Sequence, residues 1–147
     1  MTNAESIART VHADHLRRGG APYITHVQAV VDKLKGESDE VIQAAWLHDV
    51  AEMSSITVDE LIAAGISREV VTAVVALTHI NHESNENYWG MIKRNPIALK
   101  VKVADMLHNI SDNPTKYQVL KYAKGLVFLL GDVCANGSQS REDTPEY

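Results

Sequence analysis

Apolar side chains recur every three or four residues along almost the whole chain, and this is the spacing of a buried helix face. Strong helix start signals separate the apolar segments. Thr57 and Glu60 form a capping box. Asn95 followed by Pro96 is a second start signal. The valine-rich run that ends near His79 is compatible with a strand, but its length and its cap favour a helix. The pattern therefore predicts an all-α chain.

The spacing of these signals suits one domain, because 147 residues can bury a sizeable core and no repeat or linker divides them. We expect a single compact bundle of about seven or eight helices over residues 1–136, with Leu16 on the buried face of the first helix. A polar, mobile tail is expected over residues 137–147. The expected helices cover residues 3–16, 23–34, 39–52, 57–65, 67–79, 87–94, 96–113 and 116–133.

Composition excludes several classes of function. The net charge of −5 argues against a broad nucleic-acid surface, which is usually strongly basic, but a small phosphorylated ligand needs only a local positive cluster. The sequence has no apolar run of membrane-spanning length and no signal-peptide pattern at its start. The single cysteine, Cys134, fits a reducing compartment. We therefore expect a cytoplasmic protein without membrane or nucleic-acid partners.

An alanine-rich helical stretch carries polar groups where a packed helix should be apolar. His48, Asp49 and Glu52 lie among Ala, Leu, Val and Trp residues. Placing two carboxylates and an imidazole there is costly unless something pairs with them, and a divalent cation is the simplest partner. Taken alone, a His–Asp dipeptide is more often a surface pair or a helix end.

Two other helices add inward polar groups of the same kind. His26 lies between Ile24 and Val27, and Asp105 follows an apolar run. Separately, His26 could be a core histidine with its hydrogen bonds satisfied, and Asp105 could cap a helix or pair with Lys102. Together, two His and two Asp form the ligand set of a hard or borderline cation with open positions for water and substrate. Such a cation activates water and polarises a phosphoryl oxygen, and Glu52 could handle the proton.

The order of these groups resembles the HD superfamily of metal-dependent phosphohydrolases. Three motifs carry the resemblance: RRGGAPYITH at 17–26, AWLHDVAE at 45–52 and LKVKVADMLHN at 99–109. Their wording is most similar to the hydrolase domains that act on the alarmone ppGpp, and the similarity covers residues 5–115. The resemblance implies a pyrophosphohydrolase acting on a guanosine polyphosphate through metal-activated water.

Carried over by position, the resemblance assigns roles to ten residues. Mn²⁺ is the favoured cation, and Co²⁺, Zn²⁺, Fe²⁺ or Mg²⁺ remain alternatives. His12 and His108 are expected to be structural, and His79 and His82 to lie on a loop, where they are poor candidates for the second iron of a di-iron oxygenase. The implied metal ligands are His26, His48, Asp49 and Asp105, and the implied catalytic residue is Glu52. The implied substrate contacts are Arg17 at the base with Arg18 next to it, Asn109 at the ribose or phosphate, Lys102 and Tyr88.

One position departs from the alarmone hydrolases. They carry a second acid directly after the glutamate, and this chain has Met53 there. A single glutamate also resembles HD-type 5′-nucleotidases and dNTP triphosphohydrolases, which leaves that alternative open. Met53 also keeps open a non-catalytic nucleotide sensor. A homodimer formed through the valine-rich helix and the last helix is a further expectation, although core burial explains both apolar faces equally well.

Overall fold

The computed structural model describes residues 1–80 and 83–131. Within these ranges it contains nine helical segments and no strand, apart from an isolated bridge between Leu16 and Pro22. This confirms the all-α prediction. The segments are α1 (Asn3–Val11), α2 (Tyr23–Lys33), α3 (Asp39–Leu47), α4 (Val50–Met53), α5 (Val58–Ala63), α6 (Arg68–Leu77), α7 (Asn85–Lys93), α8 (Pro96–Ser111) and α9 (Lys116–Leu130).

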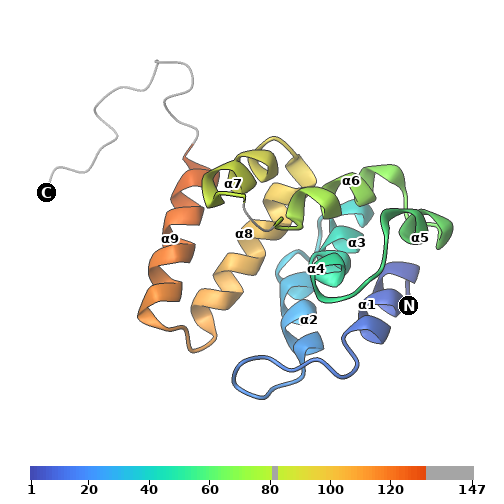
Figure 1. Ribbon diagram of the computed structural model, residues 1–147, viewed down its shortest axis with the longest axis horizontal. Coiled ribbons are helices and arrows are strands. Elements are labelled where there is room, and N and C mark those ends of the chain that lie inside the picture. The colour runs from blue at the N-terminus through green and yellow to red at the C-terminus, as the bar shows by residue number, and fades with distance from the viewer. Residues whose placement is uncertain (81–82, 132–147) are drawn as a thin grey trace, which may run out of the picture.

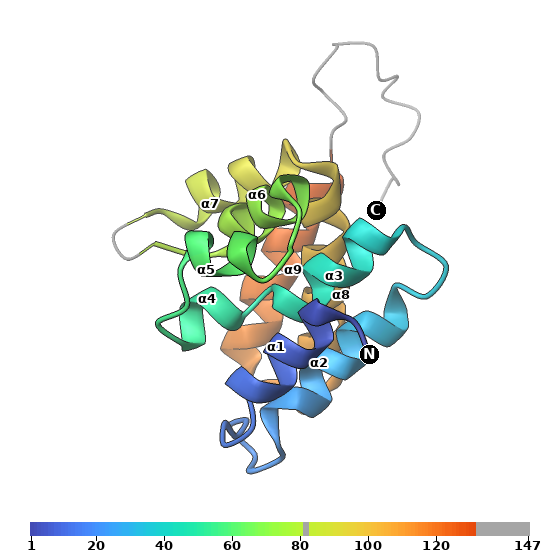
Figure 2. The ribbon, with the colours of Figure 1, turned by 90° about the vertical axis from the view of Figure 1, so that its right-hand side faces the viewer.

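Helix α3 lies at the centre of the fold, where it packs against α1, α2, α6 and α8 (Figure 1). Its Ala44 and Ala45 are completely buried, and such small side chains let the neighbouring helices approach closely. Helices α8 and α9 form an antiparallel pair, and α7 packs across both (Figures 1 and 2). The central position of α3 means that any group at its C-terminal end is surrounded by several helices.

The start signals in the sequence cap the helices as expected. The side chain of Thr57 accepts a hydrogen bond from the Glu60 backbone N–H and Glu60 returns one, which completes the capping box of α5. Asn95 caps α8 in front of Pro96. Gly65, directly after α5, adopts a φ of 89°, which only glycine tolerates without strain.

Two of the expected helices differ from the structure. The first ends at Val11 rather than at residue 16, and Leu16 is 64 % exposed, so its expected inward position is wrong. Two glycines and a proline follow it, and the chain there forms the loop closed by the bridge to Pro22. The third expected helix is interrupted at His48 and Asp49, which divides it into α3 and the single turn α4.

The remaining sequence predictions concern the ends of the chain. No helix in the described ranges combines the length and the apolar character needed to cross a bilayer. The expected tail over 137–147 lies outside the described residues, as do His82 and Cys134. The domain boundary at residue 136 therefore stays a prediction.

Candidate metal centre

Four side chains from three parts of the fold meet at the C-terminal end of α3. His26 comes from α2, His48 and Asp49 from the interruption after α3, and Asp105 from α8. One nitrogen or oxygen atom of each lies within 4.8 Å of those of the other three. His26 Nε2 is 3.0 Å from Asp105 Oδ1, and His48 Nε2 is 2.9 Å from Asp49 Oδ2. The structure therefore brings together all four residues that the sequence proposed as ligands.

The interruption of the helix explains how two consecutive residues contribute to one cluster. On a continuous α-helix, neighbouring side chains point about 100° apart. Asp49 instead has φ −110° and ψ 0° and occupies the N-cap position of α4. Its carboxylate is thereby held beside the imidazole of His48, and no regular helix geometry is needed.

The hydrogen bonds of His48 test whether a cation fits. Its Nδ1 donates to the carbonyl oxygen of Ala45 at 2.7 Å, so Nε2 is the nitrogen that is free to bind a metal. In the described part of the chain the buried Nε2 has no hydrogen-bond partner, although a carboxylate oxygen of Asp49 is close. An orphaned imidazole nitrogen beside two carboxylates suits a divalent cation.

Charge interactions within the cluster also favour the binding of a divalent cation. Burial lowers the pKa of His48, but the attraction of Asp49 and Asp105 outweighs burial and raises the pKa well above its usual value. Burial raises the pKa of Asp49, but His48 outweighs it and lowers the pKa to about 2. Burial also raises the pKa of Asp105, but the attraction of Lys102 outweighs it and lowers that pKa well below its usual value. Both aspartates are thus ionised, and in the metal-free protein a proton on His48 balances part of their charge. A divalent cation would take the place of that proton.

Neighbouring side chains orient the carboxylates. The Tyr23 hydroxyl donates to Asp49 Oδ2 at 2.6 Å. Lys102 donates to Asp105 Oδ2 at 2.8 Å, and Asn109 donates to Asp105 Oδ1 at 3.0 Å. These contacts fix the two aspartates before any ligand binds.

His26 has an outer partner of its own. Its Nδ1 lies 2.7 Å from Nδ1 of His108, one turn along α8 from Asp105. If His26 donates this hydrogen bond, its Nε2 presents a lone pair to the cluster. His108, expected from the sequence only as a structural residue, contacts the site directly in this way.

The cluster opens into a cavity of about 280 Å³ whose lining includes Glu52. One carboxylate oxygen of Glu52 accepts a hydrogen bond from the backbone N–H of His79. Partial burial raises the pKa of Glu52 above its usual value. Tyr88 and Lys102 line the same cavity, and the Lys102 ammonium lies 5.5 Å from the Tyr88 ring centre. Glu52 is therefore beside the four-residue cluster and outside it.

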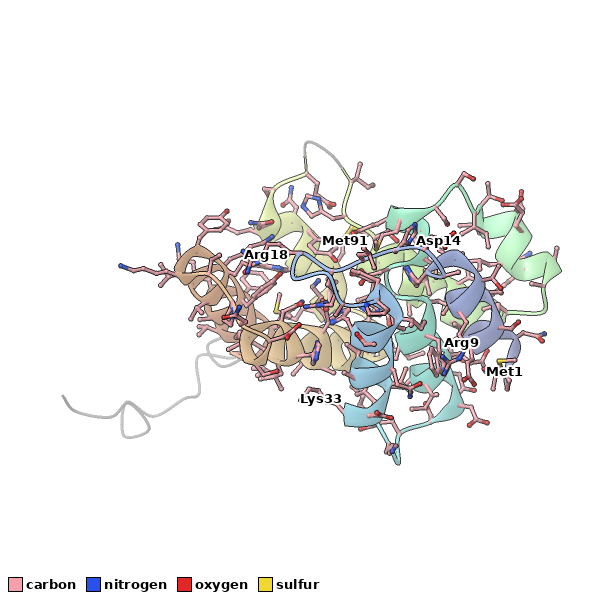
Figure 3. All side chains as sticks on the ribbon, turned by 90° about the horizontal axis from the view of Figure 1, so that it is seen from below. Met1, Arg9, Asp14, Arg18, Lys33 and Met91 are labelled. Atoms are coloured by element: carbon pink, nitrogen blue, oxygen red, sulfur yellow. The ribbon has the colours of Figure 1, made fainter. Side chains whose placement is uncertain are left out.

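A second cavity of about 440 Å³ adjoins the first and shares Asn109 with it. Arg17 donates to Asn109 Oδ1 at 3.1 Å and to Asp112 Oδ2 at 3.0 Å. Arg18, labelled on the α1–α2 loop in Figure 3, donates to the carbonyl oxygen of Asn113 at 3.2 Å. Both arginines thus line a pocket next to the metal centre.

Several residues that line the metal cavity were missed from the sequence. Tyr23 could have been found, because it lies one helical turn before His26. The sequence predicts only a loop position for His79. Lys121 and Tyr122 lie on α9, beyond the segment that resembles the hydrolases. Only the packing of α9 against α7 and α8 brings the last two to the site.

These features define a class: a helical protein in which a break in the chain after a central helix builds a buried His–Asp cluster that can hold a divalent metal ion. The family described as "HD domain" matches residues 4–118, and the chain belongs to that family. The match confirms the resemblance to HD domains. It includes all four residues of the cluster and excludes most of α9.

Individual relatives carry more specific names. The "Probable guanosine-3′,5′-bis(diphosphate) 3′-pyrophosphohydrolase" of Synechocystis is 32% identical over 122 residues, which are 75% of this chain and 16% of that protein. The "Probable GTP pyrophosphokinase" of Mycobacterium leprae is 34% identical over 121 residues, 75% of this chain and 15% of that protein. The chain therefore spans about a sixth of the length of these relatives.

One solved structure matches over most of its own length. It belongs to a metazoan ortholog of SpoT, described as hydrolysing ppGpp and acting in starvation responses. The two structures superpose with a TM-score of 0.70 at 25% sequence identity, covering 87% of this chain and 84% of that one. The likeness thus extends to the whole fold as well as to the motifs.

Proposed function

We propose that this protein is a metal-dependent phosphohydrolase that removes diphosphate from the 3′ position of ppGpp. The observation that carries the proposal is the buried His–Asp cluster at the floor of a cavity that also holds Glu52 and Lys102. Among the relatives, the names of the longer proteins point to opposite reactions, synthesis and hydrolysis. The metazoan structure, of which this chain covers 84%, carries a hydrolytic activity in its description and supports hydrolysis.

In this proposal His26, His48, Asp49 and Asp105 hold one divalent cation, with Mn²⁺ as the favoured ion. A cation bound there supplies Lewis-acid activation of water and of the substrate phosphoryl oxygen. The protein's own contribution is a fixed, ionised pair of aspartates, which Tyr23 and Lys102 hold by hydrogen bonds.

Glu52 is the proposed acid–base group. It takes a proton from the attacking water, whose oxygen bonds to the phosphorus next to the ribose 3′ oxygen, and returns that proton to the 3′ oxygen as the bond between them breaks, which yields diphosphate and GDP. Its position supports the role, because it lines the cavity without belonging to the ligand set. The hydrogen bond from the His79 backbone holds one of its oxygens and leaves the other for water.

The remaining proposed contacts surround the nucleotide. Arg17 and Arg18 line the pocket proposed for the base. Asn109 bridges that pocket and the metal cavity, where it would meet the ribose or the 3′ phosphate. Lys102 supplies positive charge near the phosphates, and Tyr88 contributes its ring, since its hydroxyl is already bonded to the carbonyl oxygen of Leu77.

Met53 leaves three other candidate functions open. In the alarmone hydrolases an acid occupies this position, so its replacement favours an HD-type 5′-nucleotidase, a dNTP triphosphohydrolase, or a sensor that binds nucleotide without turnover. Met53 does not line the described cavity, however, whereas Glu52 does. The loss of the second acid therefore leaves the proposed proton acceptor in place.

A substrate panel separates these functions. Metal-stripped protein is reloaded with Mn²⁺ and incubated with ppGpp, with nucleoside 5′-monophosphates and with nucleoside triphosphates. Release of diphosphate and GDP from ppGpp over many turnovers is the expected result. Release of phosphate or triphosphate from a 5′ position would show instead that the protein is a 5′-nucleotidase or a dNTP triphosphohydrolase. Tight nucleotide binding without turnover would show that it is a non-catalytic sensor.

Two proposals concern the setting of the protein. We infer from the single cysteine and the nucleotide substrate class that it acts in the cytoplasm.

A homodimer stays a prediction, supported by exposed apolar residues such as Val75 on α6 and Val127 on α9, which are 49% and 73% exposed. Sedimentation velocity at several protein concentrations measures this directly.

A further inference from the structure

A third hollow lies next to the metal cavity, between α7 and α9. Its volume is about 310 Å³, and it shares Asn85, Trp89 and Lys121 with the metal cavity. The two spaces therefore adjoin each other at these three side chains. The remaining lining residues of this groove are Tyr117, Leu120 and Lys124.

The groove is positively charged in a protein of net charge −5. Helix α9 carries three lysines and no acidic residue. Lys121 and Lys124, three positions apart, lie on the same side of the helix and both line the groove. Within the described ranges neither lysine forms an ion pair, so both charges are available to a ligand.

The pocket lined by Arg17 and Arg18 is also basic, but its positive groups already have partners. The Arg17 guanidinium is already engaged by the carboxylate of Asp112 at 3.0 Å and by Asn109. Amide, carbonyl and carboxylate groups dominate that pocket, which suits the hydrogen-bonding edge of a base. Arg18 donates to the carbonyl oxygen of Asn113 at 3.2 Å, so both arginines of that pocket already have hydrogen-bond acceptors. Among the described residues, Lys121 and Lys124 have neither an ion-pair partner nor a hydrogen-bond acceptor.

A nucleotide with phosphates on both its 3′ and 5′ positions presents two separate groups of negative charge. If the 3′ diphosphate lies at the metal centre, the 5′ polyphosphate needs a second cationic site within reach of it. We propose that the α7–α9 groove, through Lys121 and Lys124, binds the 5′ di- or triphosphate that is not cleaved. This inference rests on the proposed function, and it makes the groove a determinant of substrate choice.

The kinetic test compares two substrates that differ only at the 5′ position, ppGpp and guanosine 3′-diphosphate. In Lys121→Gln and Lys124→Gln variants, the preference for ppGpp, measured as the ratio of the two kcat/KM values, should fall about tenfold or more for each lysine. Lys116→Gln is the matched control, because Lys116 lies on the same helix and lines neither space. An unchanged preference in both groove variants would overturn the proposal.

A binding test is independent of turnover. GDP carries the 5′ diphosphate and no 3′ phosphate, and its base contacts are the same in every variant, so the change in its affinity on replacing a groove lysine, measured by calorimetry, reports the groove. Wild type and Lys116→Gln should bind GDP equally, and the double variant of Lys121 and Lys124 should bind it at least tenfold more weakly. If ppGpp is not hydrolysed while GDP binding depends on these lysines, the proposed function is wrong and the assignment of the groove as a 5′ diphosphate site is supported. If ppGpp is hydrolysed and GDP binding ignores the lysines, the groove assignment fails.

Discussion

Asp49 accepts a hydrogen bond from Tyr23 while its carboxylate faces His48 and His26 at 2.9 and 3.8 Å. A single side chain thus takes part in both the proposed ligand set and the network that orients it. Glu52, three residues later, lines the same cavity and has no part in the cluster. The two carboxylates can therefore be separated by experiment.

Asp49→Ala should abolish cation binding and hydrolysis together, because it removes a ligand and leaves His48 without its charge partner. Metal content after dialysis, measured by mass spectrometry, and turnover of ppGpp are the two readouts. Activity that survives this change with normal metal content would contradict the assigned ligand set.

Glu52→Gln is the paired variant. It should retain the cation and lower kcat by about 10²- to 10⁴-fold, since the amide is similar in size and cannot accept the proton. The raised pKa of Glu52 adds a pH signature. A base must be deprotonated to act, so kcat should fall as pH drops through that pKa, and this acidic limb should be absent from the Gln variant.

The burial of His12 predicts a pH dependence of the stability of the protein. It is fully buried against Tyr23, and burial lowers its pKa to about 4. Between pH 6.5 and about 4 the unfolded chain binds a proton that the folded protein does not. The free energy of unfolding should therefore fall with decreasing pH over this window, by about 1 to 3 kcal/mol.

Urea denaturation of metal-free protein at pH 7.5 and pH 5 measures this effect. The same comparison on His12→Gln removes the contribution of His12, so the loss of stability between the two pH values should shrink. An equal loss in both proteins would assign the pH dependence to other groups.

At the scale of elements, the sequence predicted the fold class and most helices from local signals. Caps such as Ser67 and Asn95 act within one turn, so they are readable without any knowledge of packing. The four proposed ligands were readable as well, because each is a polar residue in an apolar helical run. The break at His48 and Asp49 was not, since the stretch has good helix formers on both sides and no Gly or Pro.

The contribution of α9 to the site could not be predicted for a similar reason. Lys121 and Tyr122 resemble ordinary residues of an amphipathic helix, and nothing near them in the sequence suggests a ligand. Their role depends on how α9 crosses α7 and α8, which is set by side chains far away along the chain. Gly125, on α9 itself, also sets this crossing.

Gly125 permits the close contact of α9 with its neighbours. A β-carbon added there would lie 2.5 Å from the end of Met106 and 3.2 Å from Trp89. Gly125→Val should therefore destabilise the protein by about 1 to 3 kcal/mol through overpacking. Gly19→Ala is the control for stability, since a β-carbon there meets nothing within 4 Å. Thermal unfolding of both variants measures the difference, and equal melting temperatures would contradict the close packing.

For the whole molecule, the metal centre joins α2, the end of α3 and α8. A cation that binds only the folded protein should raise the melting temperature, by an amount that grows with cation concentration. At a concentration about 100 times Kd the added stability is about 2.7 kcal/mol. Differential scanning fluorimetry with Mn²⁺ tests this, and Asp49→Ala should show no such rise.

The spread of the ligands along the chain has a consequence for biosynthesis. His26 belongs to the second helix and Asp105 to the eighth, so the cluster cannot close until nearly the whole of the described chain has left the ribosome. A nascent fragment that ends before α8 carries three of the four proposed ligands. It lacks the fourth, Asp105, and also Lys102, which donates a hydrogen bond to Asp105. Cation capture is thus tied to completion of the fold, and the proposed hydrolysis cannot begin on a partly synthesised chain.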